Sequence, residues 1–164
     1  MNNFGIFDKI THSDWNKRFM ELADFISKWS RDPSTKVGAV ITDKNHRIIS
    51  TGYNGFAKGV KDLEDRYFDR DIKYKMVLHA EENAIMFAKQ RLDDCEIFVT
   101  KLPPCSHCAA LIIQSGIKDV HMQDIEIPER WKTSFNMTKK MFSEAGVKLH
   151  TVHINNYKDK LPLT

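Results

Sequence analysis

The sequence lacks any apolar run that could cross a membrane. A membrane-spanning helix needs roughly 18 or more consecutive apolar residues, and no stretch of the 164 residues approaches that length. The N-terminal residues carry charges where a secretory signal peptide would have its apolar segment. The chain also has no internal repeat, linker or low-complexity segment. These absences argue against a membrane protein, and we expect one folded domain in the cytoplasm.

The sequence also lacks a large excess of either sign of charge. The chain has 25 Lys and Arg and 22 Asp and Glu, which gives a net charge of +3. The two signs are interleaved rather than gathered into tracts. Domains that bind nucleic acid usually present a clear basic face. We therefore expect no nucleic-acid partner and favour a small anionic ligand, which needs only a few well-placed cations.

Cysteine is rare as well. There are three cysteines, an odd number that does not suit a disulfide framework. Cys105 and Cys108 form a C-x-x-C pair, which suits a metal or redox site in a reducing compartment. Cys95 lies in an apolar, strand-like run, and we expect it to be a small buried hydrophobic residue.

The spacing of apolar residues predicts an α/β domain. Helical periodicity and short runs rich in β-branched residues separate helices from strands. The expected helices cover 15–29, 79–90, 104–116 and 128–146, and the expected strands cover 37–43, 47–53, 95–100, 118–122 and 147–154. The first two strands should form a hairpin, whereas strands separated by a helix should be parallel. We therefore expect a five-stranded mixed sheet with helices on both faces, in a single domain over residues 1–154 followed by a polar tail, 155–164.

Residues 55–78 show no sustained period and are largely charged. Structureless loops of that length are uncommon in compact domains and are often functional. We interpret the aromatic residues Tyr67, Phe68 and Tyr74 as anchors that pack this loop down, with ligand contact as the alternative.

The residues with the clearest chemical meaning are His79, Glu81, Cys105 and Cys108. One imidazole and two thiolates supply three of the four positions of a tetrahedral zinc site, and a catalytic site keeps the fourth for water. Both segments fall at expected helix starts, where backbone N–H groups lower thiol pKa values and favour the thiolate. Glu81 would point towards the metal-bound water without being a ligand. It would accept a proton as zinc generates hydroxide, and then pass that proton on.

Two other interpretations of the C-x-x-C pair remain open. One is a dithiol redox motif, but the βαβ context of thioredoxin-like proteins is missing. The other is a purely structural Cys₂His₂ zinc completed by His107, although a residue inside a short C-x-x-C usually points away from the metal. This second interpretation leaves Glu81 unexplained.

H-A-E at 79–81 followed by P-C-x-x-C at 104–108 resembles the signature of the zinc-dependent cytidine deaminase superfamily. Deoxycytidylate deaminases, including phage forms, are similar to this chain over further segments, which are RDPSTKVGAVI (31–41), STGYNG (50–55), HAEENAI (79–85), PPCSHCAALIIQSGIK (103–118) and FSEAGV (142–147). The resemblance implies a Zn²⁺-dependent enzyme that converts dCMP to dUMP with release of ammonia and supplies thymidylate synthesis.

Three competing functions would share parts of this site. An editing deaminase that acts on a flipped base of a nucleic acid would need a basic groove, whereas this chain has mixed charge. Deaminases of riboflavin synthesis usually carry a fused reductase domain. A non-catalytic, zinc-stabilised interaction module would tolerate the loss of Glu81.

The resemblance also implies roles for individual residues. Asn54 should hydrogen-bond the sugar hydroxyl, and the backbone N–H of Ala80 should bind the pyrimidine carbonyl oxygen. Many relatives have a Tyr-His-x-Ser run before the last helix, where this chain has IPERWKTSF. The phosphate contacts therefore cannot be copied, and Arg130 and Lys132 are the candidate cations. Trp131 is a candidate wall of the pocket, or else a core residue beside two solvated cations.

Many deoxycytidylate deaminases are hexamers activated by dCTP and inhibited by dTTP, and the resemblance implies the same regulation here. We interpret Gly52, Tyr53, Asn54 and Gly55 as a glycine-bracketed turn whose backbone can approach an effector closely. Lys36 is a candidate partner for the effector's phosphates. Mg²⁺ is expected on the triphosphate, bound by its oxygens and by water.

Overall fold

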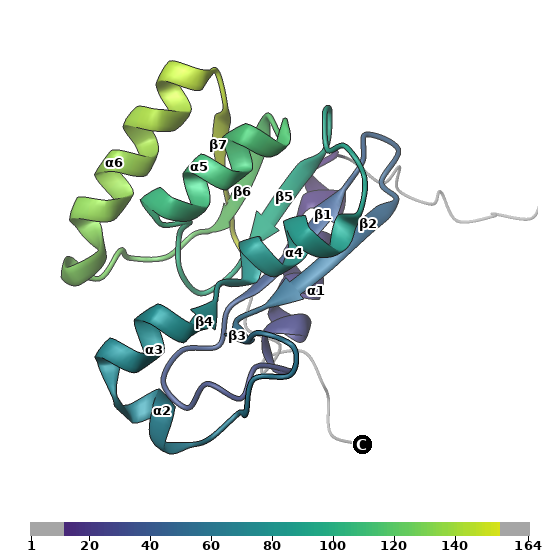
Figure 1. The fold of residues 1–164 in the computed structure, drawn as a ribbon. Coiled ribbons are helices and arrows are strands. Elements are labelled where there is room, and N and C mark those ends of the chain that lie inside the picture. Colours follow the sequence, from purple (N-terminus) through teal and green to yellow (C-terminus); the bar gives the residue numbers. More distant parts are fainter. Residues whose placement is uncertain (1–11, 155–164) are drawn as a thin grey trace, which may run out of the picture.

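The structure, a computed structural model, describes residues 12–154 of the chain. Its main sheet is built from β1 (Gly38–Thr42), β2 (Ile48–Tyr53), β5 (Glu96–Val99), β6 (Asp119–Gln123) and β7 (Lys148–Val152). Their order across the sheet is β2-β1-β5-β6-β7 (Figure 1). β1 runs antiparallel to β2 and β5, whereas β5, β6 and β7 are parallel. The predicted five-stranded mixed sheet is confirmed, and β2 and β5, which helices separate in sequence, point the same way.

Helices cover both faces of this sheet, as predicted. The helix α1 (His12–Ser27) packs on one face, and α4 (Ala80–Ala88), α5 (Ser106–Ser115) and α6 (Glu129–Ala145) pack on the other (Figure 1). None of the helices within residues 12–154 is long and apolar enough to span a bilayer.

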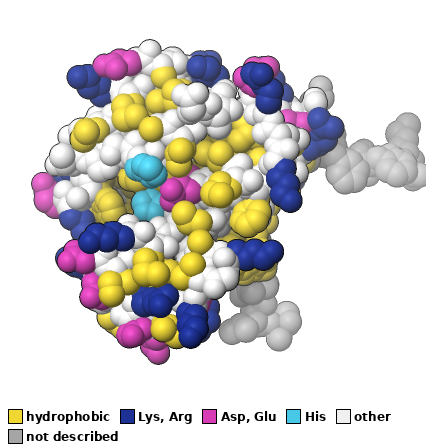
Figure 2. Space-filling model, in the orientation of Figure 1, with side chains coloured by type: hydrophobic (Ala, Val, Ile, Leu, Met, Phe, Trp, Pro, Cys, Tyr) yellow, Lys and Arg dark blue, Asp and Glu magenta, His cyan; other side chains and the backbone are white. Residues whose placement is uncertain are grey.

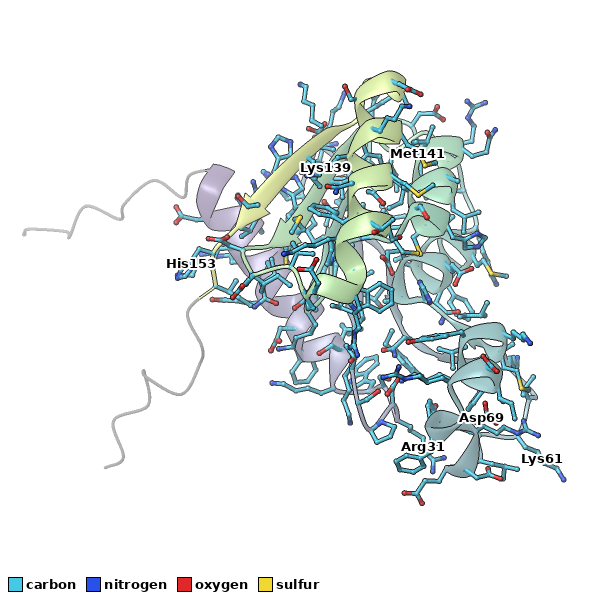
Figure 3. All side chains as sticks on the ribbon, turned by 90° about the vertical axis from the view of Figure 1, so that its left-hand side faces the viewer. Arg31, Lys61, Asp69, Lys139, Met141 and His153 are labelled. Carbon is cyan, nitrogen blue, oxygen red and sulfur yellow. The ribbon has the colours of Figure 1, made fainter. Side chains whose placement is uncertain are left out.

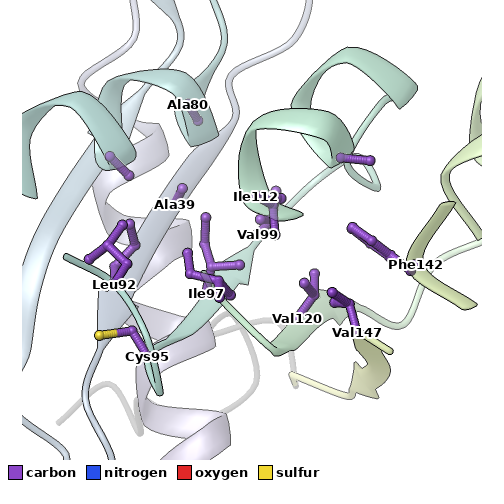
Figure 4. Close-up of a cluster of buried hydrophobic side chains, with 14 of the residues drawn as sticks. Ala39, Ala80, Leu92, Cys95, Ile97, Val99, Ile112, Val120, Phe142 and Val147 are labelled. Atoms are coloured by element: carbon purple, nitrogen blue, oxygen red, sulfur yellow. The ribbon is translucent and has the colours of Figure 1, made fainter. Parts of the chain in front are cut away.

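The core has two parts because successive strand residues point to opposite faces of a sheet. Val40 packs with Phe19 of α1 in the smaller cluster. Its neighbours Ala39 and Ile41 belong to the larger cluster beneath α4, α5 and α6 (Figure 4). Cys95 is a buried member of that larger cluster, 5% exposed, as predicted.

Helix ends follow the predicted signals closely but not everywhere. Gly116 and Gly146 adopt left-handed φ values of 95° and 67° and end α5 and α6, a conformation that glycine adopts without steric cost. The first helix ends earlier than predicted, at Ser27, whose Oγ donates to the carbonyl of Asp24 at 2.7 Å. Trp29, predicted on its apolar face, therefore lies beyond the helix and is 54% exposed.

Residues 55–78 are not a loop, so that prediction is wrong. They contain β3 (Gly55–Phe56), α2 (Asp65–Phe68), α3 (Arg70–Met76) and β4 (Val77–Leu78), with β3 and β4 paired antiparallel. The helix α3 has no buried residue but is capped by Asp69, whose Oδ1 accepts from the N–H of Ile72 at 3.1 Å. Such a helix carries no apolar stripe for a sequence pattern to detect.

The aromatic residues of this segment divide into two groups. Tyr67 is an anchor as predicted, because it is 6% exposed and lies 4.9 Å from Phe56 between ring centroids. Phe68 and Tyr74 are 70% and 57% exposed, so the anchor prediction is wrong for them. The helices α2 and α3 lie together at one end of the molecule, near Asp69 and away from α6 (Figure 3).

Candidate active site and metal centre

Two helix starts on the same face of the sheet form the candidate metal centre. His79 is the N-cap of α4, and Cys105 is the N-cap of α5. Both residues have extended backbone dihedral angles, and the helix begins at the residue that follows each of them. The carboxylate of Glu82 accepts the backbone N–H of His79 at 2.6 Å, and the thiol of Cys105 accepts the N–H of Cys108 at 3.4 Å. Each ligand-bearing turn is therefore fixed by its own helix cap.

The three predicted ligands lie together. Nδ1 of His79 is 3.5 Å from Sγ of Cys105 and 3.3 Å from Sγ of Cys108, and the three ligand atoms all lie within 4.8 Å of one another. Zinc at about 2.0 Å from nitrogen and 2.3 Å from sulfur would hold such atoms roughly 3.5 Å apart in tetrahedral geometry. The cluster therefore fits a zinc ion.

The protonation of the cluster also suits a metal. Hydrogen bonds from Cys108 and His79 lower the pKa of Cys105 to about 3 despite its burial. The Cys105 side chain in turn raises the pKa of His79 to about 9. The hydrogen bond to Cys105, together with burial, raises the pKa of Cys108. His79, Cys105 and Cys108 thus share protons through their mutual hydrogen bonds. A divalent cation that displaced these protons would be bound by one imidazole and two thiolates.

His107 does not join the ligand cluster. Its Nε2 lies 3.2 Å from Oε1 of Glu82, and its side chain is 70% exposed. The structural Cys₂His₂ interpretation loses its fourth ligand on this evidence.

Glu81 lies in the first turn of α4 and is 3% exposed. Burial raises its pKa above the usual 4.5, while His79 opposes the shift. A buried carboxyl with a raised pKa holds a proton more readily than a solvated one, which is the property that a proton carrier needs.

A pocket of about 240 Å³ opens beside the cluster. Its lining combines the metal end, namely His79, Ala80, Glu81 and Cys105, with Asp32, Asn54, Tyr67, Phe68, Arg70, Lys73, Tyr74, Arg130 and Trp131 from the other segments. Figure 2 shows His and acidic side chains side by side near the middle of this face, surrounded by hydrophobic and basic side chains. A mixed lining of this kind suits a ligand with both a ring and an anionic group.

The three residues predicted from IPERWKTSF are placed differently. Arg130 and Trp131 line the pocket, and the guanidinium of Arg130 lies 5.8 Å from the centroid of the Trp131 ring. The indole Nε1 of Trp131 is buried without a hydrogen-bond partner. Lys132 is not among the lining residues and pairs with Glu129 at 2.5 Å.

Asn54 is buried in the pocket wall, and its amide is almost fully engaged. Its Nδ2 donates to the carbonyl of Thr35 at 2.9 Å and to Oδ2 of Asp32 at 3.2 Å. Its Oδ1 accepts from the N–H of Val37 at 2.8 Å. A carbonyl oxygen has two lone pairs, so Asn54 has one acceptor position left, and a ligand hydroxyl would have to donate to it.

The segment predicted to bind an effector is not a turn. Gly52 lies in β2, which pairs with β1 through Tyr53, and Gly55 lies in β3. A Cβ on Gly52 would meet the carbonyl oxygen of Ala80 at 2.2 Å, so its glycine permits close packing of β2 against α4. Lys36 and Tyr53 are exposed, and Asn54 is the one residue of the 52–55 segment among the pocket-lining residues, which do not include Lys36 either.

Asp32 and Lys73 are pocket residues that the sequence reasoning missed. They form an ion pair of 2.7 Å although they are 41 residues apart. The Asp-Pro-Ser-Thr run at 32–35 is typical turn chemistry and could have singled out Asp32. Nothing in the sequence pattern points to Lys73 as its partner.

The sequence matches the family described as "Cytidine and deoxycytidylate deaminase zinc-binding region" over residues 13–123. An uncharacterized deaminase from Aliivibrio fischeri is 50% identical over 139 residues, which cover 84% of this chain and 92% of that protein. Human deoxycytidylate deaminase is 36% identical over 145 residues, covering 82% and 77% of the two chains. The dCMP deaminase of cyanophage S-TIM5, solved with dCMP and dUMP, has a TM-score of 0.65 and 28% identity, over 82% of this chain and 93% of that chain.

Proposed function

The chain belongs to the cytidine and deoxycytidylate deaminase family, and we propose that it converts dCMP and water to dUMP and ammonia, supplying thymidylate synthesis. The observation that carries the proposal is the His79, Cys105 and Cys108 cluster beside the buried carboxyl of Glu81 in one pocket. The substrate is proposed from relatives of 36% identity or more that are named deoxycytidylate deaminases. A pair of free thiols suits a reducing compartment such as the cytoplasm.

His79, Cys105 and Cys108 are the residues that would hold Zn²⁺. A bound zinc ion lowers the pKa of its water from 15.7 to about 7 and so supplies a nucleophile at neutral pH. The two helix caps hold the ligand-bearing turns in place before any metal arrives, which lowers the cost of ordering the site.

Glu81 would carry the protons of the reaction. Its carboxylate accepts one proton from water, delivers it to ring N3, and a second transfer brings a proton to the departing amine. The C4–N4 bond breaks, ammonia leaves, and C4 keeps the oxygen of the water as a carbonyl. Burial favours the protonated form of Glu81 between transfers, and it excludes solvent that would compete for the proton.

The base and sugar would be held by backbone and amide groups. Ala80 is the first residue of α4, where backbone N–H groups lack partners within the helix, so its N–H is the donor proposed for the pyrimidine carbonyl. Oδ1 of Asn54 would accept the sugar hydroxyl. Arg130, with Trp131 as a wall, is proposed to bind the phosphate, with Arg70 as a second cation of the lining, whereas Lys132 pairs with Glu129 outside the pocket.

The test is turnover by zinc-loaded protein on dCMP, cytidine and a cytosine-containing oligonucleotide. Ammonia release and the absorbance change of the base should be seen with dCMP, much more weakly with cytidine, and not with the oligonucleotide. Preference for the oligonucleotide would favour an editing deaminase. Stoichiometric zinc without turnover on any of the three would sink the proposed function.

Regulation of this activity is a further part of the proposal. We propose a hexamer activated by dCTP and inhibited by dTTP with Mg²⁺, with Lys36, Gly52, Tyr53 and Gly55 near the effector. An effector acts only through unequal affinity for two states, and coupling of about 1–3 kcal/mol changes affinity roughly 5–150-fold. Initial rates should be sigmoidal in dCMP, hyperbolic with dCTP and further suppressed by dTTP. A hyperbolic curve that neither triphosphate moves would remove the regulatory part alone.

A further inference from the structure

The pocket wall made by α2 and α3 is tied to the domain by a largely buried ion pair, between Asp32 and Lys73, that the proposed chemistry does not use. Nζ of Lys73 lies 2.9 and 2.7 Å from the two carboxylate oxygens of Asp32, and it donates to Oγ of Ser34 at 2.6 Å. The side chains of Asp32 and Lys73 are 1% and 14% exposed. Removing one partner of such a pair leaves the other charge buried and unpaired.

Asp32 also contacts a second part of the pocket lining, residues 34, 35 and 54. Its Oδ1 accepts from the N–H groups of Ser34 and Thr35 at 2.8 and 3.2 Å, and its Oδ2 accepts from Nδ2 of Asn54 at 3.2 Å. Burial raises the pKa of Asp32, but the bonds from Lys73 and the turn outweigh it and keep the carboxylate charged. One side chain therefore joins the 34–35 turn, the sugar-facing amide and the α3 wall.

We propose that Asp32 is the positioning residue of the nucleotide pocket, fixing Asn54 and the wall formed by residues 65–76 relative to each other. The wall carries Tyr67, Phe68, Arg70 and Tyr74 into the pocket. Asp32 and Lys73 thereby set the affinity for the nucleotide, while the chemical step stays with the metal end. This inference rests on the proposed function, because Asn54 is assigned there to the sugar.

The first test compares Lys73→Met with Lys44→Met in zinc-loaded protein. Lys44 also pairs with an aspartate, Asp94 at 2.8 Å, but both side chains are exposed and neither lines the pocket. Lys73→Met should raise the KM for dCMP about tenfold, with kcat and zinc content within about twofold of wild type. Lys44→Met should change none of these. Lys73→Arg, which keeps the charge and can bridge two carboxylate oxygens, should restore most of the affinity.

A double-mutant cycle tests whether Lys73 acts through Asp32. Asp32→Asn keeps the shape but turns an N–H group towards Lys73 or Asn54, so it should raise KM more than Lys73→Met. If Lys73 acts through Asp32, the double variant should resemble Asp32→Asn alone. Additive effects would mean that Lys73 meets the nucleotide itself, and would overturn the proposal. The proposal would also be overturned if KM were unchanged and kcat fell in proportion to the loss of zinc or of folded protein, because the role would then be merely structural.

Hydrogen exchange separates the failure of this inference from the failure of the proposed function. Amides of residues 65–76 should exchange about tenfold faster in Lys73→Met than in wild type, without any substrate, and should be unchanged in Lys44→Met. If zinc-loaded wild type does not act on dCMP, the proposed function fails while this measurement still decides the positioning role. Unchanged exchange in Lys73→Met would refute that role.

Discussion

The two ends of the pocket are held in different ways. At the metal end, the candidate ligands His79 and Cys105 are helix N-caps and Cys108 lies in the first turn of α5, so each is fixed by the cap of its own helix. At the wall end, α3 is held by Asp32, 41 residues away in sequence. The metal end therefore depends on short local motifs, whereas α3 depends on the long-range contacts of Lys73 with Asp32 and Ser34. Substitutions at the two ends should separate metal and turnover from nucleotide affinity.

The largest effect should come from removing a metal ligand. Cys108→Ala should lose zinc and essentially all turnover, with lower thermal stability, because a structural part of the metal site is lost. Cys95→Ala is the matched control, since Cys95 is also buried in the core. It should keep zinc and turnover. Elemental analysis measures the metal, and stoichiometric zinc in Cys108→Ala would remove that residue from the ligand set.

Glu81→Gln should separate chemistry from metal binding within the metal end. The amide fits the same space but cannot carry protons, so turnover should fall at least about 10²–10⁴-fold with zinc retained. Glu144→Gln, on the exposed face of α6, should have wild-type kinetics. Residual activity of Glu81→Gln above about a tenth of wild type would contradict its role as the proton carrier.

Arg130→Ala and Lys132→Ala test which cation of α6 reaches the phosphate. Arg130 lines the pocket, whereas Lys132 pairs with Glu129 outside it. A charge-assisted hydrogen bond contributes about 1.5–3 kcal/mol, so Arg130→Ala should raise the KM for dCMP roughly tenfold or more. Lys132→Ala should change it little. Deoxycytidine, which has no phosphate, is the control substrate, and an equal loss on it would point to misfolding.

Gly52→Ala tests how tightly the metal end is packed. The new Cβ would meet the carbonyl oxygen of Ala80 and the nitrogen of Ala84, at 2.2 and 2.5 Å. Pushing α4 away from β2 should cost roughly 1–3 kcal/mol of unfolding free energy. Gly55→Ala, whose Cβ would meet nothing closer than 3.9 Å, should be tolerated. Equal stability of the two variants in denaturant unfolding would mean that the interface between β2 and α4 can accommodate an extra methyl group.

The smallest effect is a pH dependence at the wall end. The folded-state pKa of Asp32 lies below its usual 3.8, so its charge stabilises the fold above that pH, and this contribution disappears as the pH falls through the folded pKa. The difference in unfolding free energy between wild type and Asp32→Asn should be constant near neutral pH and should become smaller below about pH 4. Thermal unfolding across this pH range measures the difference, and a difference that grows in acid would contradict the prediction.

The sequence predicted the metal end because its information is local. An i, i+3 cysteine pair after a proline and a histidine two residues before a glutamate need only the helix period to be placed. The β-branched run at 37–43 is likewise a local signal, and it predicted the strand β1.

The wall could not be predicted because its stability is not local. The helix α3 has no apolar stripe, and what holds it is a cap from Asp69 and the ion pair of Lys73 with Asp32. Gly52 was predicted in a turn but lies in β2, and the reason is related, since the residues that pack against it belong to α4, later in the chain. Sequence patterns carry periods and turns, but not the identity of distant partners.

Because Cys95 is buried in the core, the reactivity of the protein's thiols should report how much metal is bound. Burial raises the pKa of Cys95, and a protonated, enclosed thiol is inert towards alkylating reagents. Cys105 and Cys108 are the other two cysteines of the chain, and both would be masked by bound zinc. Alkylation should therefore be slow in the loaded enzyme and rapid at Cys105 once a chelator is added. Oxidation of the Cys105 and Cys108 pair would then be the route by which stored, metal-free protein loses its capacity to bind zinc again.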